Sequence, residues 1–261
     1  MTGYVYNDVC LKPSASGYNQ EIYPSKMPSE KKLINPKRTF REKSDFSIII
    51  TNFNRANFLA RAIRSALNQF LLRRKVEVIL VDDCSTDDSH TIWREFENSI
   101  SIVTLEKNSG VATASNVGIE FASSEYIMRL DADDYLSNEA CAHLGAILDY
   151  NTDIDFVYCD HMRVDVNGQK EKHVKLDTIE NLYKHGAGVL FRKQALEEVG
   201  CYDEKLRNAE DFDLLHRLIK AEKKGYYLPI PLYRYYIHGK NMTLNKEREI
   251  YWDFVRTKHD I

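Results

Sequence analysis

The feature that most constrains the fold is an alternation of short apolar runs and helical patterns that begins at Phe46. The apolar runs, of which the first three are rich in Ile and Val, predict strands at 46–50, 76–81, 100–105 and 126–130. Apolar residues at helical spacing predict helices at 58–67, after Ser85 as a cap, and at 111–122. This order predicts an α/β fold whose mostly parallel sheet is flanked by helices on both faces.

The pattern becomes less regular after residue 150. Strands are expected at 156–162 and 189–192, with a hairpin turn at Asn167-Gly168. Helices are expected at 193–199, 211–221 and 245–258. Because Pro229 and Pro231 interrupt residues 226–237, that stretch predicts two short edge segments. We expect this smaller, mixed half to complete a cleft.

Residues 1–44 differ from the rest because they are polar, carry four of the six prolines and show no apolar period. We interpret them as an extension that is either a loosely ordered tail or an arm across the domain or a neighbouring subunit. The tyrosines that could make such contacts are Tyr4, Tyr6, Tyr18 and Tyr23. One α/β domain is expected at 45–238, followed by a C-terminal loop and helix at 239–261.

Charge and cysteine content exclude several classes of function. The 261-residue chain has a formal net charge of -3, so it lacks the positive field that holds nucleic acid. The five cysteines form no C-x-x-C pair, which argues against a disulfide framework or a zinc site and suits a reducing cytoplasm. No apolar run approaches the roughly 20 residues that span a bilayer, so at most peripheral contact with the inner face of a membrane is expected.

Polar clusters follow three of the predicted strands, at Thr51–Asn54, Asp82-Asp83 and Asp131–Asp134. The carboxyl ends of parallel strands meet at one edge, so these carboxylates are expected to converge. A hard divalent cation, Mn²⁺ or Mg²⁺, would offset their repulsion and bind a diphosphate. Aspartates are also common in turns, which explains any one cluster well but all three poorly. The chain has no glycine-rich phosphate loop of the dinucleotide or P-loop type.

Four segments resemble, in order and spacing, the family 2 glycosyltransferases with the Rossmann-like GT-A fold. They are SIIITNFNRANFL, VILVDDCSTDDS, NSGVATASNVGIEFASSEYIMRLDADDYL and GVLFRKQALEEVGCYDEKLRNAEDFDLLHRL, and the resemblance covers residues 45–238. It implies a nucleotide-binding half at 45–135 and an acceptor-side half at 136–238. The implied activity is inverting transfer from a nucleotide diphosphate sugar, such as a UDP-sugar, to a hydroxyl of a saccharide or lipid-linked saccharide, as in bacterial-type surface polysaccharide synthesis.

The resemblance also implies roles for residues on the donor side. Thr51 and Phe53 would border the nucleotide base, Asp83 would accept a hydrogen bond from a base N–H, and Asp131 would face the ribose. Asp133 would bind the metal between the two phosphates, while Asp134 would hold the turn by hydrogen bonds. His238 would be a further ligand of the metal or the diphosphate, although a histidine in this tyrosine-rich strand could equally be structural.

On the acceptor side, the resemblance implies that Asp211 is the general base and that Glu210 orients the acceptor or the loop. Both residues precede an amphipathic helix, where carboxylates also serve as ordinary helix-start charges. Two departures from the family pattern remove cations. Where relatives often read A-R-N, this chain has Ala114-Ser115-Asn116, and where they often read Y-R-x-H, it has Tyr235-Tyr236-Ile237-His238. Arg129, Arg234 and Lys240 are candidate substitutes.

Three other interpretations compete with a glycosyltransferase. An acidic pair at a strand end also occurs in phosphoacceptor receiver domains, but there it ends the first strand and the domain is shorter. A sugar nucleotidyltransferase shares the architecture, but it usually opens with a basic glycine-rich loop that is absent here. A sugar-nucleotide-binding module without catalysis is disfavoured because Asp133 and Asp211 are both present.

Overall fold

The computed structural model of the protein describes residues 5–6, 31–34, 44–165, 167–239, 241 and 248–260. Four parallel strands form its centre in the order β5-β4-β3-β6. They are β3 (Phe46–Asn52), β4 (Val76–Asp82), β5 (Ser101–Leu105) and β6 (Tyr126–Asp131). The registers place Asn52 beside Asp82 and Thr51 beside Asp131, so the polar strand ends lie at one edge as predicted.

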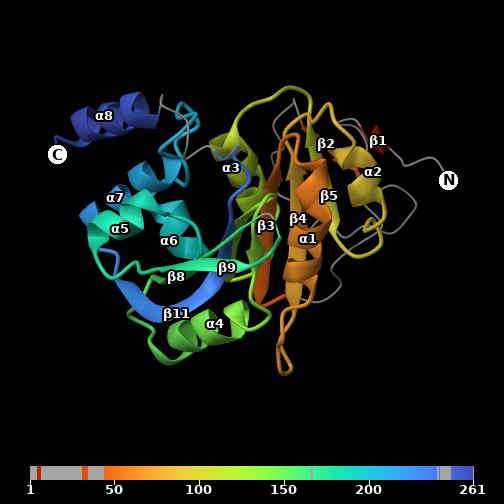
Figure 1. The fold of residues 1–261 in the computed structure, drawn as a ribbon. Helices are drawn as coiled ribbons and strands as arrows, with labels where there is room; N and C mark the ends of the chain where they lie inside the picture. Colours follow the sequence, from red (N-terminus) through yellow and green to blue (C-terminus); the bar gives the residue numbers. More distant parts are fainter. Residues whose placement is uncertain are drawn as a thin grey trace.

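Helices cover both faces of this sheet (Figure 1). One face packs against α1 (Ala56–Leu67), α2 (Ser89–Arg94) and α4 (Ala140–Tyr150). The other packs against α3 (Val111–Phe121), α5 (Ile179–Lys184), α6 (Lys193–Glu198) and α7 (Glu210–Lys220). Alternation along β3 feeds both cores, since Ile48 and Ile50 belong to the first cluster and Ile49 to the second. The predicted mostly parallel, helix-flanked α/β sheet is confirmed.

The second half extends the sheet with strands of mixed direction. They are β7 (Tyr135–Leu136), β8 (Phe156–Val164), β9 (Lys170–Val174), β10 (Val189–Arg192) and β11 (Gly225–Tyr236). Strand β10 lies antiparallel between β6 and β8, and β11 runs parallel to β8. The expected turn at Asn167-Gly168 joins β8 to β9, with Gly168 at a φ of 76° that favours glycine.

The prediction of two edge segments at 226–237 is wrong. Strand β11 is one strand with partners on both sides, β8 and β7. Its pairing with β8 shifts register on either side of Pro231, which accommodates prolines that have no N–H to donate.

Two helix predictions also need correction. Ser85 does not cap a helix, because α2 begins at Ser89 after Asp88 and the Ser85 hydroxyl bonds to Asp82. Helices α4 and α5 lie in stretches where no helix was expected. Helix α5 starts at a regular cap, where the Thr178 hydroxyl accepts a hydrogen bond from the Asn181 N–H.

The ends of the described chain contribute elements on opposite sides of the molecule (Figure 1). Strand β2 (Lys31–Ile34) pairs antiparallel with β5, and β1 (Val5–Tyr6) pairs antiparallel with β2. The rest of residues 1–43, including Tyr4, Tyr18, Tyr23 and Cys10, lies outside the described residues.

Near the other end, α8 (Arg248–His259) packs on α7, with the rings of Phe212 and Trp252 stacked 4.6 Å apart. The first three residues of the helix expected at 245–258 are not described. None of the helices in the described ranges is long and apolar enough to cross a membrane.

Candidate active site

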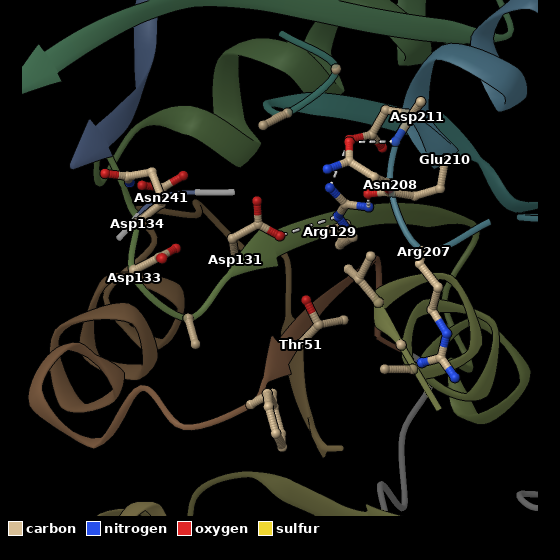
Figure 2. A pocket seen from close by; sticks show the side chains of 18 of the residues that line it. Thr51, Arg129, Asp131, Asp133, Asp134, Arg207, Asn208, Glu210, Asp211 and Asn241 are labelled. Carbon is tan, nitrogen blue, oxygen red and sulfur yellow. Dashed lines mark hydrogen bonds and ion pairs between the residues drawn. The ribbon is translucent and has the colours of Figure 1, made fainter. Parts of the chain in front are cut away.

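A cavity of about 360 Å³ lies between the carboxyl edge of the parallel strands and the second half of the chain (Figure 2). Of the residues proposed from the sequence, Thr51, Phe53, Asp83, Asp131, Asp133, Asp134, Glu210 and Asp211 line it. His238 reaches the same place through Asp133, since its Nε2 lies 2.9 Å from the Asp133 carboxylate. The fold therefore brings together the residues expected to bind the nucleotide, the metal and the acceptor.

On one side of the cavity, Asp83 is held at the start of α3. Its two carboxylate oxygens accept hydrogen bonds from the N–H groups of Ser109 (2.6 Å) and Gly110 (2.8 Å). Burial raises the pKa of Asp83, although these hydrogen bonds oppose the rise. Gly110 has a φ of 92°, a conformation that requires glycine here, so the loop that fixes the carboxylate depends on that residue.

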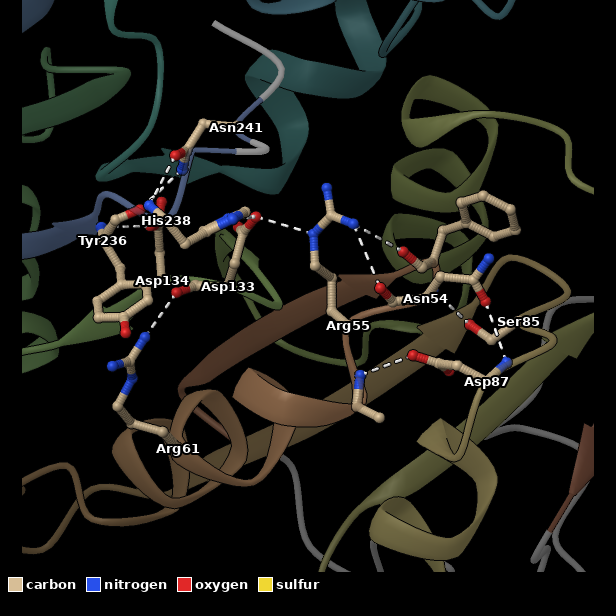
Figure 3. Close-up of polar contacts among 12 residues, drawn as sticks. Asn54, Arg55, Arg61, Ser85, Asp87, Asp133, Asp134, Tyr236, His238 and Asn241 are labelled. Atoms are coloured by element: carbon tan, nitrogen blue, oxygen red, sulfur yellow. Dashed lines mark hydrogen bonds and ion pairs between the residues drawn. The ribbon is translucent and has the colours of Figure 1, made fainter. Parts of the chain in front are cut away.

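The turn after β6 holds Asp133 and Asp134 in different environments (Figure 3). Asp134 is buried and accepts hydrogen bonds from the Tyr233 hydroxyl (2.7 Å) and the Tyr236 N–H (2.8 Å). Burial, together with Asp133 and Asp131, raises its pKa well above the usual value. Asp134 therefore ties the turn to β11, the strand that leads to His238.

Asp133 points into the cavity, where its Oδ2 lies 2.9 Å from both Arg55 Nε and His238 Nε2 (Figure 3). The histidine is itself positioned, because its ring stacks on Phe58 and its N–H donates to Asn241. In the described part of the chain, no three His, Cys, Asp or Glu side chains gather as a metal-binding group. Asp133 and His238 are thus a pair of convergent oxygen and nitrogen donors, which suits a metal that takes its other ligands from a diphosphate.

On the opposite side of the cavity, Glu210 and Asp211 begin α7 and face Arg129 of β6 (Figure 2). Arg129 donates to Glu210 at 3.0 Å and to Asp211 at 2.7 Å, and its Nε lies 3.4 Å from Asp131. Burial raises the pKa of Asp211 to about 7; Arg129 opposes the rise, and Glu210 and Asp131 add to it. A carboxylate with that pKa can accept a proton near neutral pH.

A glycine fixes Asp211 from the other side. A Cβ added to Gly186, just after α5, would lie 2.3 Å from the Asp211 Cβ. Any side chain at this position would therefore displace the carboxylate or the loop. Nothing in the local sequence pattern marks Gly186, because the contact joins residues 25 positions apart.

Three residues were candidates to replace the family's missing arginines, and the structure places them differently. Arg129 lines the cavity, Arg234 donates to the carbonyl of Pro231 and is not among the lining residues, and Lys240 is not described. Ser115 is buried and donates to the Val111 carbonyl within its own helix.

Two cavity arginines were missed by the sequence reasoning. Arg55 pairs with Asp133, and Arg207 donates to Asn108 at 3.2 Å. Arg55 directly follows the Thr51–Asn54 cluster, and that position was a usable signal; Arg207 has none beyond its place shortly before Glu210.

Comparison with known proteins agrees with this geometry. The family model for glycosyl transferase family 2 matches residues 47–201, and that for glycosyltransferase like family 2 matches residues 156–256. The minor teichoic acid biosynthesis protein GgaA of Bacillus subtilis is 33% identical over 69% of this chain and 44% of its own length. The chain thus spans less than half the length of this curated relative.

Solved structures show the same fold. S. aureus TarS 1-349 in complex with UDP-GlcNAc matches 82% of this chain and 66% of its own, with a TM-score of 0.68 and 21% identity. The mannosyltransferase PcManGT from Pyrobaculum calidifontis, in complex with GDP-Man and Mn²⁺, matches 84% and 62% with a TM-score of 0.60 and 19% identity. Since the first family model alone covers more than half of the chain, this protein belongs to glycosyl transferase family 2 and has the GT-A fold.

Proposed function

We propose that the protein transfers a sugar from a UDP-sugar to an acceptor hydroxyl with inversion at the anomeric carbon. The observation that carries the proposal is the position of Asp211, a partly buried carboxylate in the same cavity as the acidic strand edge, with a pKa near neutrality. The relative named for teichoic acid biosynthesis and the neighbour in complex with UDP-GlcNAc support this donor class and a polysaccharide or glycoconjugate acceptor.

In this mechanism, Asp211 is the general base. Its Oδ2 is engaged by Arg129, and no described residue donates a hydrogen bond to Oδ1, which is the oxygen we assign to the acceptor proton. The acceptor oxygen forms a bond to the anomeric carbon as the bond to the diphosphate breaks on the opposite face. A single displacement of this kind inverts the anomeric configuration. Glu210 shares Arg129 with Asp211 and would orient the acceptor or the loop.

The donor would bind along the edge of the parallel strands. Thr51 and Phe53 would border the base, and Asp83 would accept its N–H because each oxygen keeps a lone pair beyond its backbone hydrogen bond. A carboxylate fixed by two backbone amides cannot rotate away, so it selects a base with a donor at that position. Asp131 would face the ribose.

Asp133 and His238 would hold the divalent cation, Mn²⁺ or Mg²⁺. When bound, the metal neutralises charge on the diphosphate as it leaves. Arg55 now pairs with Asp133, and it is a second positive group at this position. Asp133 and His238 already point toward each other, and hydrogen bonds from Tyr236 to Asp134 and from His238 to Asn241 hold them there.

The test is the substitution Asp211→Asn. Asparagine keeps the size of the side chain but cannot take a proton, so turnover should fall by roughly 10² to 10⁴ fold while affinity for UDP-sugar stays nearly unchanged. Asp153→Asn, which alters an exposed aspartate paired with Lys224, is the matched control and should leave both quantities unchanged. Near-full turnover by Asp211→Asn, or a product with retained configuration, would contradict the proposal. Donor binding without any transfer by the unmodified protein would indicate a binding module.

A further inference from the structure

Arg129 is an unusual residue for its place in the fold. It lies in the central strand β6 between Met128 and Leu130, both fully buried, and its own side chain is only 9% exposed. Removing a guanidinium from water is costly unless charged partners surround it. Here three carboxylates do so, from Asp131, Glu210 and Asp211 (Figure 2).

The three contacts use different nitrogens of one rigid group. Nη1 donates to Glu210, Nη2 donates to Asp211, and Nε faces Asp131. The planar fork of arginine can hold two carboxylates at a fixed spacing, whereas the single ammonium of lysine cannot. Because Asp131 ends β6 and the other two acids begin α7, Arg129 links the donor edge of the cavity to its acceptor side.

The charges around Arg129 argue against a role in binding the diphosphate. One guanidinium faces three carboxylates, so this cluster has no surplus positive charge for a diphosphate. Arg129 is therefore a poor substitute for the cation that Ser115 replaces. Its hydrogen bonds instead fix the position of Asp211. Two further features constrain this residue: Ala209, two positions earlier, is in a left-handed conformation with a φ of 61°, and the Asp211 Cβ packs against Gly186.

We propose that Arg129 is a positioning residue that holds the Asp211 carboxylate toward the acceptor through Oδ2 and couples it to Asp131 on the donor side. This inference rests on the proposed function, since it assigns a purpose to Asp211 as the base. It makes the base part of a fixed unit that spans the two halves of the domain.

The experiment compares Arg129→Lys and Arg129→Gln with the unmodified protein for turnover, donor affinity and the pH dependence of kcat. Lysine keeps the charge but cannot hold both carboxylates at a fixed spacing. The Asp211 carboxylate should therefore be slightly displaced, and kcat should fall roughly 10 to 10² fold. Glutamine loses both the charge and this spacing, so kcat should fall further. Donor affinity should stay within about threefold in each variant, because the base acts on the acceptor.

The pH profile provides a readout that a merely structural arginine would not move. Arg129, Asp131, Glu210 and Tyr202 carry charge or can titrate next to Asp211. Lys184 and His185 also line the cavity, in the segment that leads to Gly186. Loss of the positive charge in Arg129→Gln favours protonated Asp211, so the acid limb of kcat should move to higher pH. The limb should stay close to its original position in Arg129→Lys.

Arg192 provides the matched control. It is also a partly buried strand arginine with several acceptors, including the carbonyls of Leu148 and Ile154, but it does not line the cavity. Arg192→Gln should lower thermal stability without moving the acid limb of kcat.

Donor affinity that falls in parallel with kcat in both Arg129 variants would overturn the inference, because Arg129 would then act in donor binding, directly or through Asp131. An unmoved acid limb in Arg129→Gln would overturn it too, and so would an unchanged kcat in Arg129→Lys. Asp211→Asn assayed alongside separates the two proposals. If it loses turnover while the Arg129 variants keep theirs, only the positioning role fails; if it keeps turnover, the proposed function fails.

Discussion

Asp83, Asp133 and Asp211 line one cavity, yet each carboxylate has different partners. Backbone amides hold Asp83, Arg55 and His238 converge on Asp133, and Arg129 holds Asp211. These partners determine what each carboxylate can do. Backbone amides fix Asp83 as a hydrogen-bond acceptor, and the convergent imidazole makes Asp133 suitable for binding a cation. The buried guanidinium and the neighbouring acids make Asp211 suitable as a base. Substitutions at the three positions should therefore have separable effects.

We predict that Asp133→Ala abolishes the metal dependence of UDP binding, because it removes one of two convergent donors. Calorimetry with UDP and Mn²⁺, with and without chelator, measures this directly. In the unmodified protein, affinity should fall sharply on chelation, while in Asp133→Ala it should be low under both conditions. Asp83→Ala is the comparison: it should keep the response to metal but weaken the preference for uridine over cytidine. Metal-dependent binding that survives in Asp133→Ala would show that the ion lies elsewhere.

At the scale of residues, the sequence identified the acidic positions but not what holds them. Acidic clusters at the ends of predicted parallel strands converge by topology alone, so Asp83 and Asp131–Asp134 could be grouped from the pattern. Arg129 and Gly186 could not be assigned in this way. Their contacts with Asp211 cross 82 and 25 positions and depend on how α7 and the loop after α5 are placed against β6.

At the scale of elements, α7 connects the site to the end of the described chain. Its first turn carries Glu210 and Asp211, and on another side Asp213, which is fully buried, accepts hydrogen bonds from Arg217, Lys258 and His259. The last two residues belong to α8. Since Trp252 of α8 also lines the cavity, this polar contact helps to position one border of the site.

We predict that Asp213→Ala lowers the free energy of unfolding by roughly 2 kcal/mol, because a buried acceptor with three hydrogen-bond partners is lost. Urea denaturation measures this.

The stabilisation should also depend on pH. Burial tends to raise the pKa of Asp213, but its hydrogen bonds with Lys258 and His259 and the charge of Arg217 lower it overall. The stabilisation should therefore be present above the ordinary aspartate pKa and be lost as the pH falls through the lowered value. Asp253→Ala, which removes an exposed pair with Arg256, should cost less than about 0.5 kcal/mol. Equal losses of unfolding free energy in the two variants would mean that the buried cluster stabilises the fold no more than an exposed ion pair does.

Elements with a strong period were predicted well, and elements defined by tertiary partners were not. The strands at 46–50 and 76–81 are short runs rich in β-branched residues, and 126–130 is a short, mostly apolar run; since nearly all of these residues are buried, the local pattern suffices. Strand β11 was misjudged because two prolines usually mark an edge, whereas here β8 accommodates them by shifting register. Helix α4 lacks a side-chain cap and buries small residues such as Ala140 and Gly145, so its boundaries have no polar signal.

At the scale of the whole molecule, the sheet runs from β1 and β2 through the parallel centre to β11 and β7. Strand β2 pairs with β5 from Lys31 opposite Leu105 to Ile34 opposite Ile102, so the N-terminal segment covers the outer edge of the parallel core. The cavity lies at the carboxyl ends of the strands, and its lining residues in the described chain all fall between Thr51 and Trp252. The protected edge and the proposed substrate site therefore lie in different parts of this fold.

We predict that a shortened chain starting at Ser44 keeps its affinity for UDP but self-associates. Removal of β2 leaves the N–H and C=O groups of β5 without partners, and such an edge pairs readily with another sheet. Calorimetry reports nucleotide affinity, and sedimentation velocity at increasing protein concentration reports association. Thr104→Lys in the shortened chain places a charge on the exposed edge opposite the former position of Lys32, so it should reduce association without altering UDP affinity. A shortened protein that stays folded but no longer binds UDP would show that the N-terminal segment closes the cleft, and one that stays monomeric would show that β5 needs no cover.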